Sequence, residues 1–89
     1  MDKNDQLFSQ LLYLLHQNAS HTLEKIDANN HSEEDKNQLL QHLDILKMLK
    51  EKTKGNLNQE LNHIQNMMLD EFEANCMKKI VNFNVNESA

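Results

Sequence analysis

The sequence of 89 residues contains one glycine, no proline and no tryptophan, and all nine of its basic residues are lysines. A sheet protein needs a turn about every 8–12 residues, usually marked by glycine, proline, asparagine or aspartate. Glycine occurs only at position 55, and the many asparagines mostly lie within segments of helical periodicity. These absences exclude a β-sandwich, a β-barrel and a glycine-rich phosphate-binding loop.

A single cysteine, Cys76, cannot form a disulfide within the chain. Small secreted domains usually depend on disulfides, so a lone cysteine favours a reducing compartment. No run approaches the roughly 18 apolar residues of a membrane-spanning helix, and the first residues lack the pattern of a signal peptide. We therefore expect a cytoplasmic protein without a membrane partner.

Three segments have the periodicity of amphipathic helices. The first covers residues 5–27 and the second residues 33–54, and the third follows a cap at Asn56 or Asn58 and ends near residue 80. Short connections between consecutive helices make neighbours antiparallel. The pattern predicts an all-α fold of three antiparallel helices, helix-turn-helix-turn-helix.

Local signals support the two turns. Ser32 stands before Glu33, Glu34 and Asp35, which is a typical helix start, because Ser32 can accept a backbone N–H and acids suit the positive helix end. Gly55 is the expected helix C-cap of the second segment, since glycine adopts the left-handed conformation without penalty.

The chain is short enough to be one domain, which we assign to residues 1–80. In the tail, residues 81–89, apolar side chains alternate with asparagine as they do in a strand. A flexible tail, a short strand that pairs with its twin in a dimer, and a helix continued through Phe83 all fit this pattern.

The first two helical segments carry more apolar surface than one small core needs. On a helix, the apolar residues of the first segment fill an arc of about 180°, wider than the ~100° stripe of a surface helix. Because exposed leucines favour association, we expect a homodimer that completes the bundle. The positions expected in the core or the dimer interface are Leu7, Leu11, Leu12, Leu15, Leu39, Leu43, Leu46, Leu49, Ile64, Met68 and Phe72.

The run Asp-Ile-Leu-Lys-Met-Leu-Lys-Glu-Lys-Thr-Lys-Gly-Asn-Leu at positions 44–57 resembles the signature of a small bacterial family, the domain of unknown function 1844. The match covers about fourteen contiguous positions, and a leucine-rich first helix precedes it as in that family. The segment between the first two helices is shorter here than in the family. The resemblance implies a small helical bacterial protein and carries over no active site.

Lysines gather at the end of the second segment, at Lys47, Lys50, Lys52 and Lys54. Three of them lie within about 60° on one helix face, so they form a basic corner on an acidic chain. This corner suits an acidic partner. RNA or the ribosome is the less favoured choice, because the net charge is -5 and neither arginine nor aromatic stacking residues accompany the lysines.

Glu60 and His63 have the Glu-x-x-His spacing of carboxylate-bridged di-iron bundles. Counted from the apolar stripe, however, they lie about 90° and 150° away, so they point outward. His16, His21 and His42 are likewise expected to be solvated, and we expect no metal and no cofactor.

Cys76 lies on the apolar stripe of the third segment with no base beside it, which indicates a buried structural thiol. No serine lies in a strained turn of the kind that activates a nucleophile. We expect no catalytic residue and no enzyme activity.

These observations favour a non-catalytic homodimeric protein-interaction module. Its second contact surface would be the basic corner or the acidic stretch of Asp70, Glu71 and Glu73. The alternative is an RNA- or ribosome-associated factor that uses the basic corner.

Overall fold

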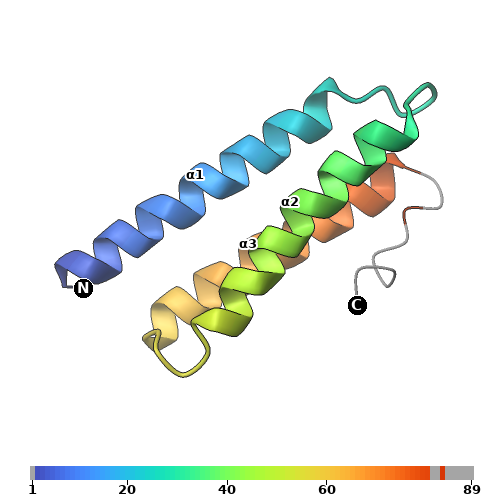
Figure 1. Cartoon of the computed structure of the whole chain (residues 1–89). Coiled ribbons are helices and arrows are strands. Elements are labelled where there is room, and N and C mark those ends of the chain that lie inside the picture. Colours follow the sequence, from blue (N-terminus) through green and yellow to red (C-terminus); the bar gives the residue numbers. More distant parts are fainter. Residues whose placement is uncertain (1, 81–82, 84–89) are drawn as a thin grey trace.

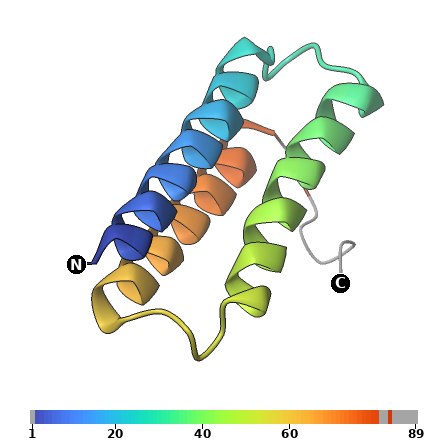
Figure 2. The same ribbon diagram turned by 60° about the vertical axis from the view of Figure 1, so that its left-hand side comes forward.

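The computed structural model describes residues 2–80 and 83, which form three α-helices: α1 (Lys3–Lys25), α2 (Glu33–Lys52) and α3 (Gln59–Lys79). Each helix packs against the other two, and α2 runs antiparallel to both neighbours (Figures 1 and 2). The all-α arrangement of three helices expected from the sequence is confirmed. None of the helices in this part of the chain is long and apolar enough to cross a membrane.

Polar contacts join α1 to α3 at both ends and show that these helices run in the same direction. At one end, Asn58 Nδ2 donates to Asp5 Oδ2 over 3.0 Å. At the other end, Lys79 Nζ donates to the backbone oxygens of Leu23 and Glu24. The ammonium group thereby meets carbonyls at the C-terminal end of α1, where a cation is favourable.

The helices begin at residues whose side chains accept backbone N–H groups. Asp2 caps α1 by accepting from Asp5 N over 2.8 Å, so α1 begins at Lys3 and not at the expected Asp5. Ser32 and Asp35 form a reciprocal capping box at α2. Of the two caps considered for α3, the structure uses Asn58.

The assignment of Gly55 as the helix C-cap is wrong. α2 ends at Lys52 and its C-cap is Thr53, whose hydroxyl donates to Leu49 O over 2.7 Å and whose backbone N–H also bonds to that oxygen. Gly55 lies two residues later in the turn. Its φ of 83° confirms the left-handed conformation expected there.

The main core lies at the end of the bundle where α1 and α3 finish and α2 begins. It is made of aliphatic and aromatic side chains with Cys76: Ala19, Leu23, Ile26, Leu39, Leu43, Leu46, Leu69, Phe72, Cys76, Ile80 and Phe83. Toward the opposite end the interior is less apolar, because Leu12 and Leu61 share it with the buried side chain of Gln65.

The end of α3 differs from the continued helix considered for the tail. α3 finishes at Lys79 with Ile80 as its C-cap, and Phe83 N donates to Ile80 O over 3.3 Å. Phe83 is buried in the main core, which therefore extends past the domain end expected at residue 80. The strand or flexible tail expected for 81–89 otherwise falls on residues 81, 82 and 84–89, which lie outside the described residues.

Candidate functional site

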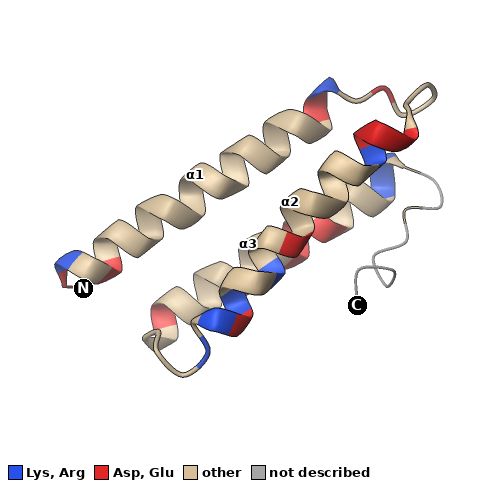
Figure 3. Ribbon diagram, viewed as in Figure 1, with Lys and Arg blue, Asp and Glu red and all other residues tan. Residues whose placement is uncertain are grey.

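The middle of α1 carries no charged side chain. Between Asp5 and Glu24, residues 6–23 include no Asp, Glu, Lys or Arg. Figure 3 shows α1 in tan, the colour of uncharged residues, between the charged residues at its two ends. In contrast, α2 and α3 carry charges along their length. At about 1.5 Å per residue, this charge-free run extends over roughly 27 Å of helix.

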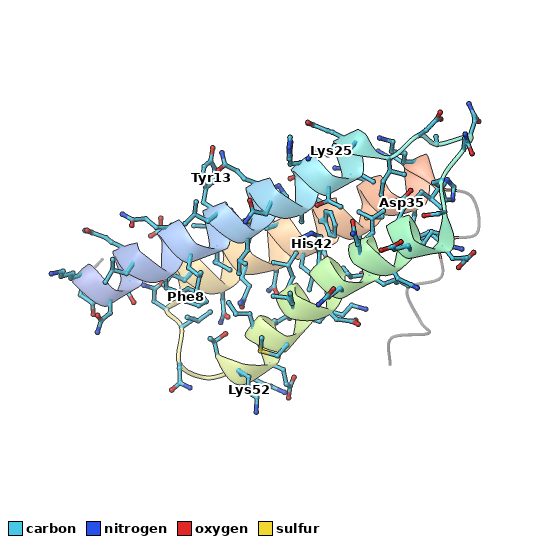
Figure 4. All side chains as sticks on the ribbon, turned by 45° about the horizontal axis from the view of Figure 1, so that its top comes forward. Phe8, Tyr13, Lys25, Asp35, His42 and Lys52 are labelled. Atoms are coloured by element: carbon cyan, nitrogen blue, oxygen red, sulfur yellow. The ribbon has the colours of Figure 1, made fainter. Side chains whose placement is uncertain are left out.

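Large apolar side chains are exposed on this run. Leu7, Leu11 and Leu14 are 51%, 43% and 57% exposed, and their spacing of four and three residues places them on one stripe of α1. Tyr13 is 56% exposed and points away from the bundle in Figure 4. We call these four residues the α1 face.

An apolar groove of about 560 Å³ adjoins the α1 face, between α1 and α3. Tyr13 and Leu14 belong to both the face and the groove, and α3 contributes the half-buried Ile64 and Met68. Ser9 and Gln10 complete the lining. The α1 face and this α1–α3 groove form a continuous uncharged surface.

The residues expected in the core or the dimer interface divide into three groups. Leu12, Leu39, Leu43, Leu46 and Phe72 are buried, which confirms their place in the core. Half-buried positions are Leu15, Leu49, Ile64 and Met68. Leu7 and Leu11 are exposed and belong to no core of the single chain. The surplus apolar surface expected on α1 is therefore present.

The basic corner is built by the end of α2 and the turn after it. Lys50, Lys52 and Lys54 are exposed, and Lys47 is half-buried. Figure 4 shows Lys52 pointing away from the bundle. The structure thus presents three of the four lysines to solvent, while contact with RNA or a protein stays a prediction.

Two lysines of the corner share a hollow of about 270 Å³ between α2 and α3. We call it the lysine hollow. Its lining consists of Lys50, Glu51, Lys54, Gly55, Asn62 and Asn66. Lys52, which lies on another side of α2, is not among these residues.

Two histidines are less solvated than expected. His42 points toward α1 in Figure 4, and its Nε2 lies 3.1 Å from Thr22 Oγ1. Partial burial lowers the pKa of His42 from its ordinary value of 6.5. Nδ1 of the half-buried His16 is enclosed without a hydrogen-bond partner. The helical spacing could not reveal either environment, because both depend on the neighbouring helix.

The other candidate residues lie as the sequence indicates. Glu60 and His63 are exposed, and His21 is exposed as well. In the described part of the chain, no three His, Cys, Asp or Glu side chains are grouped so that they could hold a metal ion. The Cys76 thiol is fully buried, and burial, with a contribution from the Glu73 carboxylate, raises its pKa to about 12.

Sequence reasoning missed Gln65. Its side chain is 3% exposed, and neither the oxygen nor the nitrogen of its amide has a hydrogen-bond partner. The available signal was its position in α3, four residues after Leu61 and four before Leu69, which are both buried. The position of Gln65 on the buried side of α3 encloses it, although the polarity of its side chain would predict an exposed residue.

No family model matches the chain, and neither the curated proteins nor the solved structures contain a match. The similarity of residues 44–57 to the domain of unknown function 1844 therefore stays a prediction from the sequence.

Proposed function

We propose that the protein is a non-catalytic interaction module that works as a homodimer, and that two copies pair through the α1 face and the α1–α3 groove. The observation that carries the proposal is the exposure of Leu7, Leu11 and Leu14 on a helix run without charge. The cores of protein interfaces are depleted of charged residues and rich in aromatic and apolar side chains. This surface has that composition.

The distribution of charge favours α1 as the surface through which two copies would pair. Each chain carries a formal charge of -5, so two copies repel one another across most of their surfaces. The charge-free run of α1 is the place where this repulsion is weakest. A twofold axis lets the same surface serve both partners, so the second copy supplies an equally uncharged and apolar surface.

The area that a stable interface needs indicates that two copies pair through more than the α1 face. A standard interface buries about 800 Å² on each partner, and a single helix stripe is narrow by comparison. The groove extends the apolar surface across to Ile64 and Met68 of α3. Pairing through both elements would also cover Tyr13, an aromatic residue of the kind enriched at interface centres.

The state of Cys76 is consistent with the proposed role without catalysis. Cys76 is buried with its pKa raised, so its thiol is protonated and inaccessible to a substrate at neutral pH. We place this module in a reducing compartment, because a chain with one cysteine cannot form an internal disulfide.

Sedimentation velocity over micromolar to high micromolar concentrations tests the proposal. We expect about twice the chain mass of 10.5 kDa for the native protein. The double variant Leu11→Gln, Leu14→Gln should shift to the monomer mass with an unchanged helical circular dichroism spectrum. Met77→Gln is the matched control, because Met77 is 53% exposed on α3 and outside the proposed surface.

Three results would overturn this assignment. A native protein that stays monomeric at high micromolar concentration removes the homodimer. A double variant that dimerises as strongly as the native protein removes the α1 face as the interface. Loss of the dimer in Met77→Gln would also place the interface elsewhere.

A further inference from the structure

Two pairs of polar residues line the lysine hollow: Lys50 and Lys54 come from the end of α2 and the turn after it, and Asn62 and Asn66 come from α3. Asn62 and Asn66 are four residues apart on α3, about one helical turn. Lys50 lies in the last turn of α2, and Lys54 lies in the turn that follows the helix end at Lys52. Gly55 also belongs to the lining, and apart from its chain neighbours no heavy atom lies within 4 Å of the place where its Cβ would be. The hollow is therefore lined on both sides by residues that carry hydrogen-bond donors.

Donors outnumber acceptors in this lining. Each lysine ammonium offers three N–H groups and accepts none, and each asparagine amide offers two. Glu51 is the one acidic residue that lines the hollow. On a chain of net charge -5, the corner with Lys47, Lys50, Lys52 and Lys54 is the place where positive charge is concentrated. This donor set suits an anion that presents several oxygen atoms.

The C-terminal end of α2 would repel an anion through its unpaired carbonyls. Thr53 reduces that effect, because its backbone N–H and its hydroxyl both bond to Leu49 O, and the hydroxyl also lies 3.4 Å from Lys50 O. Lys54 N donates to Glu51 O over 3.3 Å. Three of the last helix carbonyls thus have partners within the turn that forms the hollow.

We propose that the lysine hollow binds a phosphate group, with Lys50 and Lys54 supplying the charge and the amides of Asn62 and Asn66 supplying directed hydrogen bonds. The site uses residues of α2 and α3 that lie outside the α1 face and the α1–α3 groove. It is therefore independent of the proposed dimer, and either proposal can fail without the other. The phosphate group belongs either to a free phosphomonoester or to the backbone of RNA.

Titration of ¹⁵N-labelled native protein with inorganic phosphate at low ionic strength is the first test. We expect saturable shifts of the Gly55 backbone amide and of the Asn62 and Asn66 side-chain amides. Lys50→Gln and Lys54→Gln should each weaken binding by about tenfold, equivalent to about 1.4 kcal/mol. Asn62→Ala, which changes no charge, should weaken it as well.

Lys52→Gln is the matched control, because it removes one exposed lysine of the same corner that does not line the hollow. It should change the affinity less than about twofold. A loss as large as that of Lys50→Gln would show general attraction to the corner and overturn the site. Absent or non-saturable shifts in the native protein would overturn it too.

A second titration with a single-stranded oligouridylate distinguishes the sources of the phosphate group. Tighter binding than inorganic phosphate, falling steeply with salt and lost in Lys54→Gln, would identify an RNA backbone as the ligand. If the protein binds inorganic phosphate and binds the oligouridylate no more tightly, a free phosphomonoester is the ligand that fits the site. Both outcomes support the site and differ only in what fills it.

Discussion

Thr22 of α1 and His42 of α2 meet between the two helices, with Thr22 Oγ1 and His42 Nε2 3.1 Å apart. The Thr22 hydroxyl also lies 3.1 Å from Asn18 O, to which it donates its single proton. His42 Nε2–H is therefore the donor to Thr22, which fixes Nδ1 as the nitrogen that takes up a proton on acidification.

This contact predicts a pH dependence of stability. Burial lowers the pKa of His42 in the folded chain below the 6.5 of the unfolded chain, so the unfolded state binds more protons in that interval. The contribution of His42 is fully present above about pH 6.5 and is lost as the pH falls through the lower, folded-state value. Thermal melts between about pH 8 and pH 5 should show the melting temperature falling on acidification.

His42→Gln should flatten that fall in melting temperature. His21→Gln, which changes an exposed histidine of α1, should keep it. Equal pH dependence in native protein and His42→Gln would assign the effect to other groups.

The second prediction concerns Gly55, in the turn after α2. Its φ of 83° is strained for a β-branched residue, although nothing lies within 4 Å to obstruct a side chain. We expect Gly55→Val to lower the free energy of unfolding by about 1–2 kcal/mol in chemical denaturation. Gly55→Asn should cost less, because asparagine enters the left-handed region more readily. Equal stability of the two variants would contradict a purely conformational cost.

Gln65 predicts a stabilising substitution. An amide that is buried without partners has lost its hydrogen bonds to water and gained none in return. Gln65→Leu should therefore raise the free energy of unfolding by about 1–3 kcal/mol. Gln38→Leu, at an exposed position of α2, should change it by less than about 0.5 kcal/mol. A destabilised Gln65→Leu would show that a water or another group satisfies the amide.

The buried thiol predicts low reactivity. With a pKa of about 12, roughly one Cys76 thiol in 10⁴ is ionised at about pH 8, and its sulfur is enclosed in the core. A disulfide reagent should react slowly with the folded chain and rapidly in concentrated guanidinium chloride. Leu43→Ala, which opens a cavity in the same core, should accelerate the reaction of the folded chain. A fast reaction of the native protein would contradict this burial.

Local signals in the sequence predicted the elements well where one residue decides the conformation. Ser32 caps α2 as expected, and the cap of α3 is Asn58, one of the two alternatives predicted for it. Gly55 has the positive φ expected of it. The C-cap at Thr53 was missed, because a threonine hydroxyl can bond to several nearby backbone groups. The sequence does not show that this one bonds to Leu49 O. The first helix was expected to begin at residue 5, whereas the cap at Asp2 makes it begin at Lys3.

The sequence by itself determined the number of helices, their order, the two turns and the apolar surplus of α1, because these follow from spacing and from single-residue backbone preferences. Tertiary structure alone decided which residues of that surplus are enclosed. Leu11 and Leu12 are adjacent, yet one is exposed and the other buried. The tertiary structure likewise decided that Gln65 is enclosed and that His42 meets Thr22. The reason is that burial depends on the rotation of each helix toward its neighbours, which the packing of the whole bundle sets.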